Sequence, residues 1–280
     1  MKVRSYQDVL DRILTAIGKS PHLTICHHSN STTTPSSSLP YPLYCIQYTS
    51  KQPNSSLIYI SAGIHGDEPA GVECAIRLIE QLSDKKRYKY WDSLLDRFNW
   101  MISPCDNPYG YERNIRENAD GLDLNRMFET PQHTKETEFI ADSLNHISIP
   151  KHISREKGSK RLAITVALDL HEDMDSDGFY LWERRRSYHT PIGDVIVNKV
   201  NTVCSINRTS KIEGHYNQNG VITLLDQITS KGWTRGRYLA EYEDTSCLIL
   251  ETPTWVDWNS RIKAHMMAIQ AAIDMFANPM

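Results

Sequence analysis

The sequence contains no apolar run long enough to cross a bilayer, and its first twenty residues lack the features of a secretory signal. A signal peptide needs an unbroken apolar core and a small-residue cleavage site. Here the apolar residues recur at helical spacing among charged ones: Val9, Leu10, Ile13, Leu14 and Ile17. This pattern predicts an amphipathic helix over residues 1–20. We therefore expect no membrane partner.

Cysteine pairs of the CxxC type are also absent. The 6 cysteines are scattered along the chain, and several lie inside apolar runs, as Cys247 does. Their spacing indicates neither a cysteine-bound structural zinc site nor a disulfide framework. Reduced thiols that pack as small hydrophobic groups are the simplest interpretation, and they favour a cytoplasmic location.

The chain has little net charge, because 31 Lys and Arg residues face 34 Asp and Glu residues, for a formal charge of -3. This balance gives no electrostatic basis for capturing nucleic acid, so we expect no such partner. Short basic runs occur at residues 85–87 and 184–186. We interpret both as solvent-facing segments.

Strand-like and helix-like patterns alternate along the chain without an internal repeat, which predicts a single α/β domain over residues 1–280. A long polar loop is expected over residues 104–128, and loops of this length are often functional. The predicted strands cover residues 43–48, 57–62, 98–103, 162–170, 179–182, 221–226 and 247–251. The predicted helices cover residues 70–82, 135–147, 192–204 and 258–276.

Three of the predicted strands end in a residue that can bind a metal or carry a proton, namely His65, His171 and Glu251. The ends of strands in an α/β sheet open into the crevice where ligands bind. Glu68 lies three residues after His65, so both side chains can face one point on a helical first turn. Two histidines and one carboxylate leave a fourth tetrahedral position for water, which is the catalytic form of a zinc site.

Each of these residues also has an ordinary structural interpretation. A His-x-x-Glu pair such as that of His65 and Glu68 arises often by chance. His171 could be a hydrogen-bonded histidine at the edge of the core, and Glu251 could cap a helix or form an ion pair. Because four such residues occur together at three strand ends, a chance arrangement is much less expected than for any one of them.

The long loop carries cationic and amide side chains at close spacing, with Arg116, Asn118, Asn125 and Arg126 around a turn at Gly121. Arginine binds a carboxylate through two parallel hydrogen bonds, and asparagine adds neutral donors. The segment could therefore hold an anionic substrate. The alternative is a hydrogen-bonded surface loop, which would not need so many cationic groups.

The ordered set of motifs resembles the zinc carboxypeptidase superfamily, which includes the aspartoacylase and succinylglutamate desuccinylase branch. The similarity extends over about residues 58–253 and is strongest to small bacterial members, including murein-peptide amidases. The motifs are His65-Gly66-Asp67-Glu68, Asn107-Pro108-x-Gly110, Arg116-x-Asn118, Asp123-Leu124-Asn125-Arg126, Asp169-Leu170-His171 and Glu251-Thr252-Pro253.

This resemblance implies a mixed, mostly buried central sheet with helices on both faces, and one Zn²⁺ per chain. It also implies a role for each matched residue. The zinc ligands would be His65, Glu68 and His171, and Glu251 would be the general base and proton shuttle. Arg116 would polarise the scissile carbonyl, Asn125 and Arg126 would hold the terminal carboxylate of the substrate, and Asp123 would orient the first histidine.

The implied activity is hydrolysis of an amide bond next to a free carboxylate, in a peptide or an N-acyl amino acid. Deacylation of an N-acyl amino acid and cleavage of a murein peptide remain alternatives, and so does a non-enzymatic binding protein on the same fold. Asp67 favours peptide cleavage, because deacylases more often have asparagine there. The mobile tyrosine of digestive carboxypeptidases has no clear counterpart, although Tyr238 and Tyr242 lie in the corresponding interval.

Overall fold

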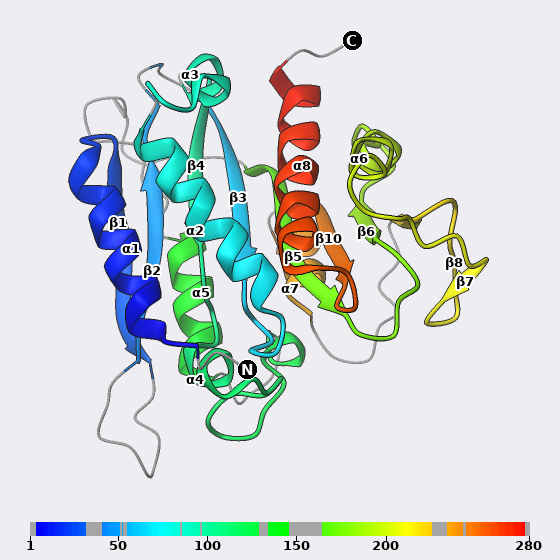
Figure 1. Cartoon of the computed structure of the whole chain (residues 1–280), viewed down its shortest axis with the longest axis horizontal. Helices are drawn as coiled ribbons and strands as arrows, with labels where there is room; N and C mark the ends of the chain where they lie inside the picture. Colours follow the sequence, from blue (N-terminus) through cyan, green and yellow to red (C-terminus); the bar gives the residue numbers. More distant parts are fainter. Residues whose placement is uncertain are drawn as a thin grey trace.

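The computed structural model describes residues 4–31, 41–50, 52, 55–84, 86–95, 97–128, 134–145, 164–225, 234–242 and 245–277. An eight-stranded sheet runs through the centre of the molecule (Figure 1). In spatial order its strands are β1 (Leu23–Ser31), β2 (Tyr41–Tyr48), β4 (Phe98–Ser103), β3 (Ser56–Ala62), β5 (Ile164–Asp173), β10 (Ser246–Pro253), β6 (Tyr180–Arg185) and β9 (Val221–Leu225).

The sheet is mixed, with a parallel centre. Strands β4, β3, β5 and β10 run parallel to one another, and β9 runs parallel to β6. The antiparallel pairs are β1 with β2, β2 with β4, and β10 with β6. A parallel centre is a buried arrangement, which matches the nearly continuous apolar sequence of β3.

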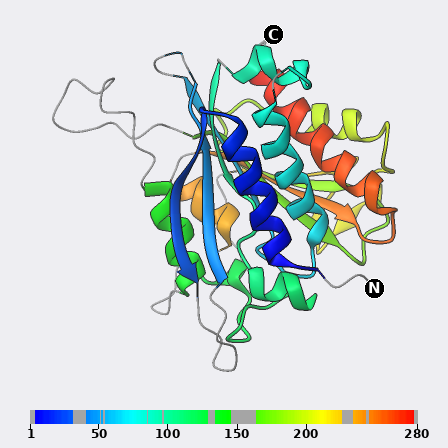
Figure 2. The same cartoon turned by 60° about the vertical axis from the view of Figure 1, so that its left-hand side comes forward.

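Helices cover both faces of the sheet (Figure 2). On one face, α1 (Tyr6–Lys19), α2 (Pro69–Ser83), α8 (Trp258–Ala277) and α6 (Gly193–Val200) pack in this order, each against the next. On the other face, α5 (Lys135–Asn145) contacts β1 and β2, and α7 (Arg235–Tyr242) contacts β10 and β6. The predicted α/β class, with a mixed sheet between helices, is confirmed.

Strand β3 shows how the sequence produces the two layers. Ile58 and Ile60 join the apolar cluster beneath α1, α2 and α8, whereas Leu57 and Tyr59 join the cluster beneath α5. Successive side chains of a strand point to opposite faces, so a strand buried on both faces must be apolar at almost every position. The single-domain boundary over residues 1–280 stays a prediction.

Several elements differ from the predictions. The expected loop over residues 104–128 contains α4 (Pro108–Arg113) and a 3₁₀ turn at Leu124–Arg126. Four further features have no counterpart among the predicted elements, namely β1, α3 (Lys89–Leu95), α7, and the hairpin of β7 (Lys211–Ile212) and β8 (His215–Tyr216). Among the described residues, no helix combines the length and apolar character that crossing a membrane requires.

Candidate active site

The candidate site lies at the carboxyl end of β3. Strand β3 lies between β4, the next strand in sequence, and β5, the strand after that. The chain therefore continues first to one side of β3 and then to the other. Such a reversal of strand order opens a crevice at the carboxyl ends of the strands. The segment from Gly63 to Glu68 leaves β3 at this point, and α2 begins directly after it at Pro69.

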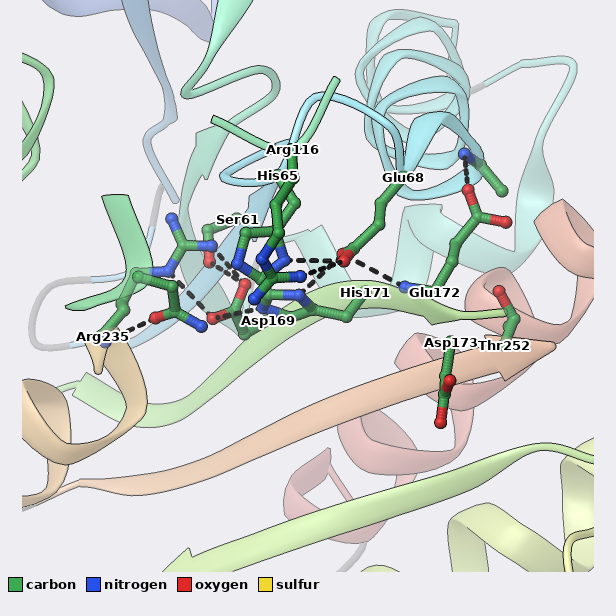
Figure 3. A network of polar contacts seen from close by, with 12 residues as sticks. Ser61, His65, Glu68, Arg116, Asp169, His171, Glu172, Asp173, Arg235 and Thr252 are labelled. Atoms are coloured by element: carbon green, nitrogen blue, oxygen red, sulfur yellow. Dashed lines mark hydrogen bonds and ion pairs between the residues drawn. The ribbon is translucent and has the colours of Figure 1, made fainter. Parts of the chain in front are cut away.

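His65, Glu68 and His171 converge in this crevice, and each side chain is buried (Figure 3). The Nδ1 atom of His65 lies 2.6 Å from Oε1 of Glu68, and the Nδ1 atom of His171 lies 2.8 Å from Oε2 of the same carboxylate. One potential ligand atom from each of the three residues lies within 4.8 Å of the other two. The predicted ligand set therefore forms one cluster.

The outer ring nitrogens of both histidines face carboxylates. Nε2 of His65 lies 3.2 Å from Oδ1 of Asp123, and Nε2 of His171 lies 3.2 Å from Oδ2 of Asp169. A carboxylate on the far nitrogen fixes the tautomer of a metal-binding histidine and raises its basicity. The donor set and its outer partners therefore fit a zinc ion bound through two nitrogens and one oxygen.

Electrostatic interactions inside the cluster hold the ligand carboxylate in its charged form. Burial alone would raise the pKa of Glu68, but His171 and His65 lower it to about 2. Burial likewise opposes the charged form of His171, yet Asp169 and Glu68 raise its pKa well above the usual value. Glu68, His171 and Asp169 thus interact strongly, and a positive charge on His171 is favoured because the ring lies between the carboxylates of Glu68 and Asp169.

Asp123 is shared between two partners. Besides facing His65, its Oδ2 accepts hydrogen bonds from Nε and an Nη of Arg116, at 3.1 and 3.0 Å. Burial raises the pKa of Asp123, but His65 and Arg116 outweigh burial and hold the pKa below its usual range. Another nitrogen of Arg116 lies 3.5 Å from Oε1 of Glu68. This places the guanidinium at the edge of the ligand cluster.

Glu251 lies beside His171, since the two residues are directly paired on the parallel strands β10 and β5. Neighbours paired in this way project to the same side of a sheet, and both side chains line the same cavity. The prediction that these strands end at the two residues is wrong, because β5 continues to Asp173 and β10 to Pro253. Burial raises the pKa of Glu251 to about 8, against the opposing charge of His171.

Asn125 and Arg126 both line the cavity but differ in exposure. Asn125 is buried, and its Oδ1 accepts a hydrogen bond of 2.9 Å from the backbone N–H of Arg235. Arg126 is exposed, and its guanidinium donates to the backbone carbonyl of Asn125. A buried amide and an exposed guanidinium therefore stand next to each other at the cavity wall.

The cavity above the ligand cluster has a volume of about 1200 Å³. Alternate residues of β6 form one wall, namely Tyr180, Trp182 and Arg184. The interpretation of the basic run at residues 184–186 as solvent-facing is wrong for Arg184, whose side chain is buried in this wall. The alternation of a strand places it there, on the same side as Tyr180.

Two buried residues of the site were missed by the sequence analysis. Asp169 lies two positions before His171 in the Asp169-Leu170-His171 motif, in which the resemblance implies a role only for the histidine. Arg235 begins α7, in a stretch without any family signature.

The two candidates for the mobile tyrosine differ in what the structure describes. Tyr238 packs against Phe128 with ring centroids 5.6 Å apart, and the side chain of Tyr242 lies outside the described residues.

The segment around His65 is in backbone contact with the segment that begins α4. A Cβ atom on Gly66 would lie 2.0 Å from the carbonyl carbon of Gly110, so a side chain cannot be accommodated at Gly66. The amide nitrogen of Gly66 donates to the carbonyl of Arg116, and the Asn107 side chain donates to that same carbonyl. These contacts fix Arg116 relative to His65.

Residues 22–158 of the chain match the sequence profile of the zinc carboxypeptidase family. The resemblance to zinc carboxypeptidases is confirmed. Carboxypeptidase D of Mus musculus is 29% identical over 158 residues, which are 51% of this chain and 11% of that protein. Carboxypeptidase SOL1 of Arabidopsis thaliana is 31% identical over 93 residues, 31% of this chain and 19% of the relative. The zinc carboxypeptidase-like chain thus spans a small part of these relatives.

Solved structures show the same fold over nearly the whole zinc carboxypeptidase-like chain. A candidate metallopeptidase from Shewanella amazonensis SB2B has a TM-score of 0.75 at 18% identity, covering 97% of this chain and 93% of that one. A metallo-carboxypeptidase from Pseudomonas aeruginosa, in complex with (2-guanidinoethylmercapto)succinic acid, has a TM-score of 0.69 at 14% identity. It covers 98% of this chain and 69% of the other.

Proposed function

We propose that the protein is a zinc-dependent hydrolase that cleaves an amide bond next to a free carboxylate in a peptide. The observation that carries this proposal is the convergence of His65, Glu68 and His171 at the base of the cavity, with Glu251 beside them. Two histidines and one carboxylate supply three of four tetrahedral positions, so one Zn²⁺ per chain would keep a position open for the reaction. Bound zinc would supply Lewis-acid polarisation of the scissile carbonyl and activate water.

Glu251 is proposed as the group that moves protons. It accepts a proton from the attacking water and then donates it to the leaving nitrogen of the amide. The burial that raises its pKa to about 8 makes both transfers accessible near neutral pH, because the carboxyl group can hold or release a proton there. A fully solvated glutamate would be a poorer acid–base catalyst in the second step.

Arg116 and the pair of Asn125 and Arg126 are proposed to bind the substrate at two points. Arg116 lies at the edge of the ligand cluster, where its charge can stabilise the oxygen of the scissile carbonyl as negative charge develops. Asn125 and Arg126 line the same cavity and would hold the substrate carboxylate. Binding at both points would align the amide bond with Glu251.

The size of the cavity favours a peptide over an N-acyl amino acid as the substrate. Its volume of about 1200 Å³ exceeds the roughly 300–1,000 Å³ that is usual for small-molecule sites. A short acylated amino acid would leave much of this space filled with water. A peptide would also contact the wall formed by Tyr180, Trp182 and Arg184.

A cytoplasmic location remains part of the proposal.

The test is a comparison of substrates with zinc-loaded protein and a matched Glu251→Gln variant. The substrates are a peptide with a free carboxyl terminus, its amidated form, an N-acyl amino acid and a murein tripeptide. We expect turnover of the free-acid peptide, weak turnover of the amide, and a 10²–10⁴-fold smaller rate for the variant, since an amide cannot accept the proton.

The variant should bind zinc as tightly as the parent protein, which shows that a lost rate reflects chemistry rather than a lost metal. Preferential cleavage of the N-acyl amino acid would replace peptide cleavage by deacylation. If the parent binds zinc but cleaves none of the substrates, the hydrolase proposal itself fails. If Glu251→Gln retains the parent's rate, Glu251 has a structural role.

A further inference from the structure

Arg235 is a fully buried cation behind the ligand cluster, and it does not line the cavity. Its guanidinium contacts the buried carboxylate of Asp169 (Figure 3). It also contacts the buried carboxylate of Asp106. Two parallel hydrogen bonds go to Asp169, from Nε at 3.0 Å and from an Nη nitrogen. A paired contact of this kind fixes the plane of the carboxylate as well as its position.

The same carboxylate faces a predicted zinc ligand. Oδ2 of Asp169, which accepts the hydrogen bond from Nε of Arg235, lies 3.2 Å from Nε2 of His171. Ser61 completes the surroundings with a hydroxyl 3.3 Å from Oδ1. The approach of Asp169 to His171 is an ion-pair contact rather than an aligned hydrogen bond, so the charge and position of Asp169 bear on the His171 ring. The position of Asp169 in turn depends mainly on Arg235.

Arg235 also reaches the substrate-binding side of the site, through its backbone. Its N–H donates a hydrogen bond of 2.9 Å to Oδ1 of Asn125. The carboxamide of Asn125 is thereby held at the cavity wall by the first residue of α7. One residue thus contacts both the partner of a metal ligand and a residue of the carboxylate-binding pair.

We propose that Arg235 is a positioning residue that couples zinc binding at His171 to substrate binding at Asn125. This inference rests on the proposed function, since it assigns Arg235 a role toward the zinc and substrate of that site. The side chain acts on the metal through Asp169, and the backbone acts on the substrate through Asn125. The alternative is a core ion pair that stabilises the fold and leaves the zinc affinity of the folded protein unchanged.

The experiment measures the zinc dissociation constant of the folded protein by competition with a chromogenic chelator. Removing an outer partner of a metal ligand weakens zinc binding by about 10–100-fold. We expect this loss for Arg235→Met and for Asp169→Asn, and a smaller loss for Arg235→Lys. Asp106→Asn is the matched control, because Asp106 contacts the same guanidinium but no ligand, and its zinc affinity should stay close to the parent's.

The double variant of Arg235→Met and Asp169→Asn tests whether Arg235 acts through Asp169. If it does, the double variant should bind zinc about as weakly as either single variant, since both remove the same interaction. Losses that multiply would overturn the proposed route through Asp169. Because Arg235→Met leaves two buried carboxylates without their arginine and can fail to fold, Arg235→Lys and Asp169→Asn carry the test in that case.

The substrate side is measured separately at saturating zinc. Arg235→Met should raise the KM for a free-acid peptide because the start of α7 shifts and Asn125 shifts with it, and Arg235→Lys should recover most of the KM. An unchanged KM in Arg235→Met would overturn the coupling to Asn125. Zinc affinities of Arg235→Lys and Asp169→Asn equal to the parent's would overturn the metal side. A parent protein that binds no zinc would instead contradict the proposed function.

Discussion

The two histidines of the candidate zinc site each have an aspartate and an arginine beyond them, but the two sets differ greatly in exposure to solvent. An outer triad consists of His65, Asp123 and Arg116, whose side chains are 4%, 25% and 38% exposed. An inner triad consists of His171, Asp169 and Arg235, whose side chains are 2%, 1% and 0% exposed. In each triad an arginine holds a carboxylate that faces the outer nitrogen of the histidine.

The difference in exposure separates the roles that the two arginines can take. Water can replace part of the contact between Arg116 and Asp123, so Arg116 can turn toward a substrate at modest cost. Arg235 has no such freedom, because a buried ion pair that loses one partner leaves an uncompensated charge. The outer triad is thus suited to contact the substrate, and the inner triad is suited to hold the metal-binding geometry.

The largest effect is expected from removing the carboxylate of the inner triad. Asp169→Ala should lower the free energy of unfolding by about 3–5 kcal/mol, because Arg235 loses its main buried partner. Asp123→Ala should cost at most about 1 kcal/mol, since its ion pair with Arg116 is partly exposed. Urea unfolding in the presence of a chelator measures both values without a contribution from zinc. Equal losses in the two variants would show that exposure does not distinguish the triads.

A somewhat smaller effect is expected on catalysis when the arginine of the outer triad is removed. Arg116→Ala should lower kcat by about 10²–10³-fold, the usual result of deleting one donor to a developing negative charge. The free energy of unfolding should change little. Arg116→Lys should recover part of the rate, because lysine keeps the charge but cannot form the paired contact. Steady-state kinetics would contradict this role if Arg116→Ala raised KM and left kcat unchanged.

Arg126 extends the comparison to the exposed cavity wall. A free-acid peptide and its amidated form, each measured with parent and Arg126→Ala, give a double-mutant cycle. The coupling between Arg126 and the substrate carboxylate should be about 2 kcal/mol, the lower end of the range for such contacts, because Arg126 is exposed. A coupling near zero would mean that Arg126 points elsewhere, and that the carboxylate is not what fixes the substrate.

The smallest effect is a pH dependence that originates beside the inner triad. The pKa of Glu251 is raised from 4.5 to about 8 by burial, so its proton is lost at higher pH than that of a solvated glutamate. Because a general base must be deprotonated, kcat/KM should rise with pH. A zinc ion would favour the charged carboxylate, so the acidic limb should lie between these two values. The pH profile of kcat/KM checks this, and a limb at or below pH 4.5 would show that burial does not control the base.

Sequence reasoning identified the outer triad better than the inner one, for a physical reason. Asp123 and Arg116 lie seven residues apart in one loop, where closely spaced polar groups are visible as a pattern. Asp169 and Arg235 are 66 residues apart and meet because α7 packs against the sheet. No local pattern marks such a contact, so the interaction had to be read from the packing of the chain.

The ends of β5 and β10 and the basic run at residues 184–186 show a second limit of prediction from sequence. Apolar runs located β5 and β10 well, but the strands continue through polar residues to Asp173 and Pro253, because hydrogen bonding to neighbouring strands decides where a strand ends. Arg184 belongs to a basic run that looks solvated, yet the alternation of β6 turns it into the cavity wall. Residue spacing and the ordered motifs predicted the residues that converge here, whereas the partners of those residues depended on tertiary packing.

The contact between Gly66 and Gly110 has a consequence for exchanging parts of this protein with its relatives. The two backbones are so close that the loop bearing His65 and the start of α4 are packed directly against each other, without room for a side chain at Gly66. A chimaera that imports one of the two segments from a homologue would have to match the other segment to within a single methyl group. The two segments should therefore be inherited and engineered as a unit, and a library that shuffles them independently should yield mostly misassembled sites.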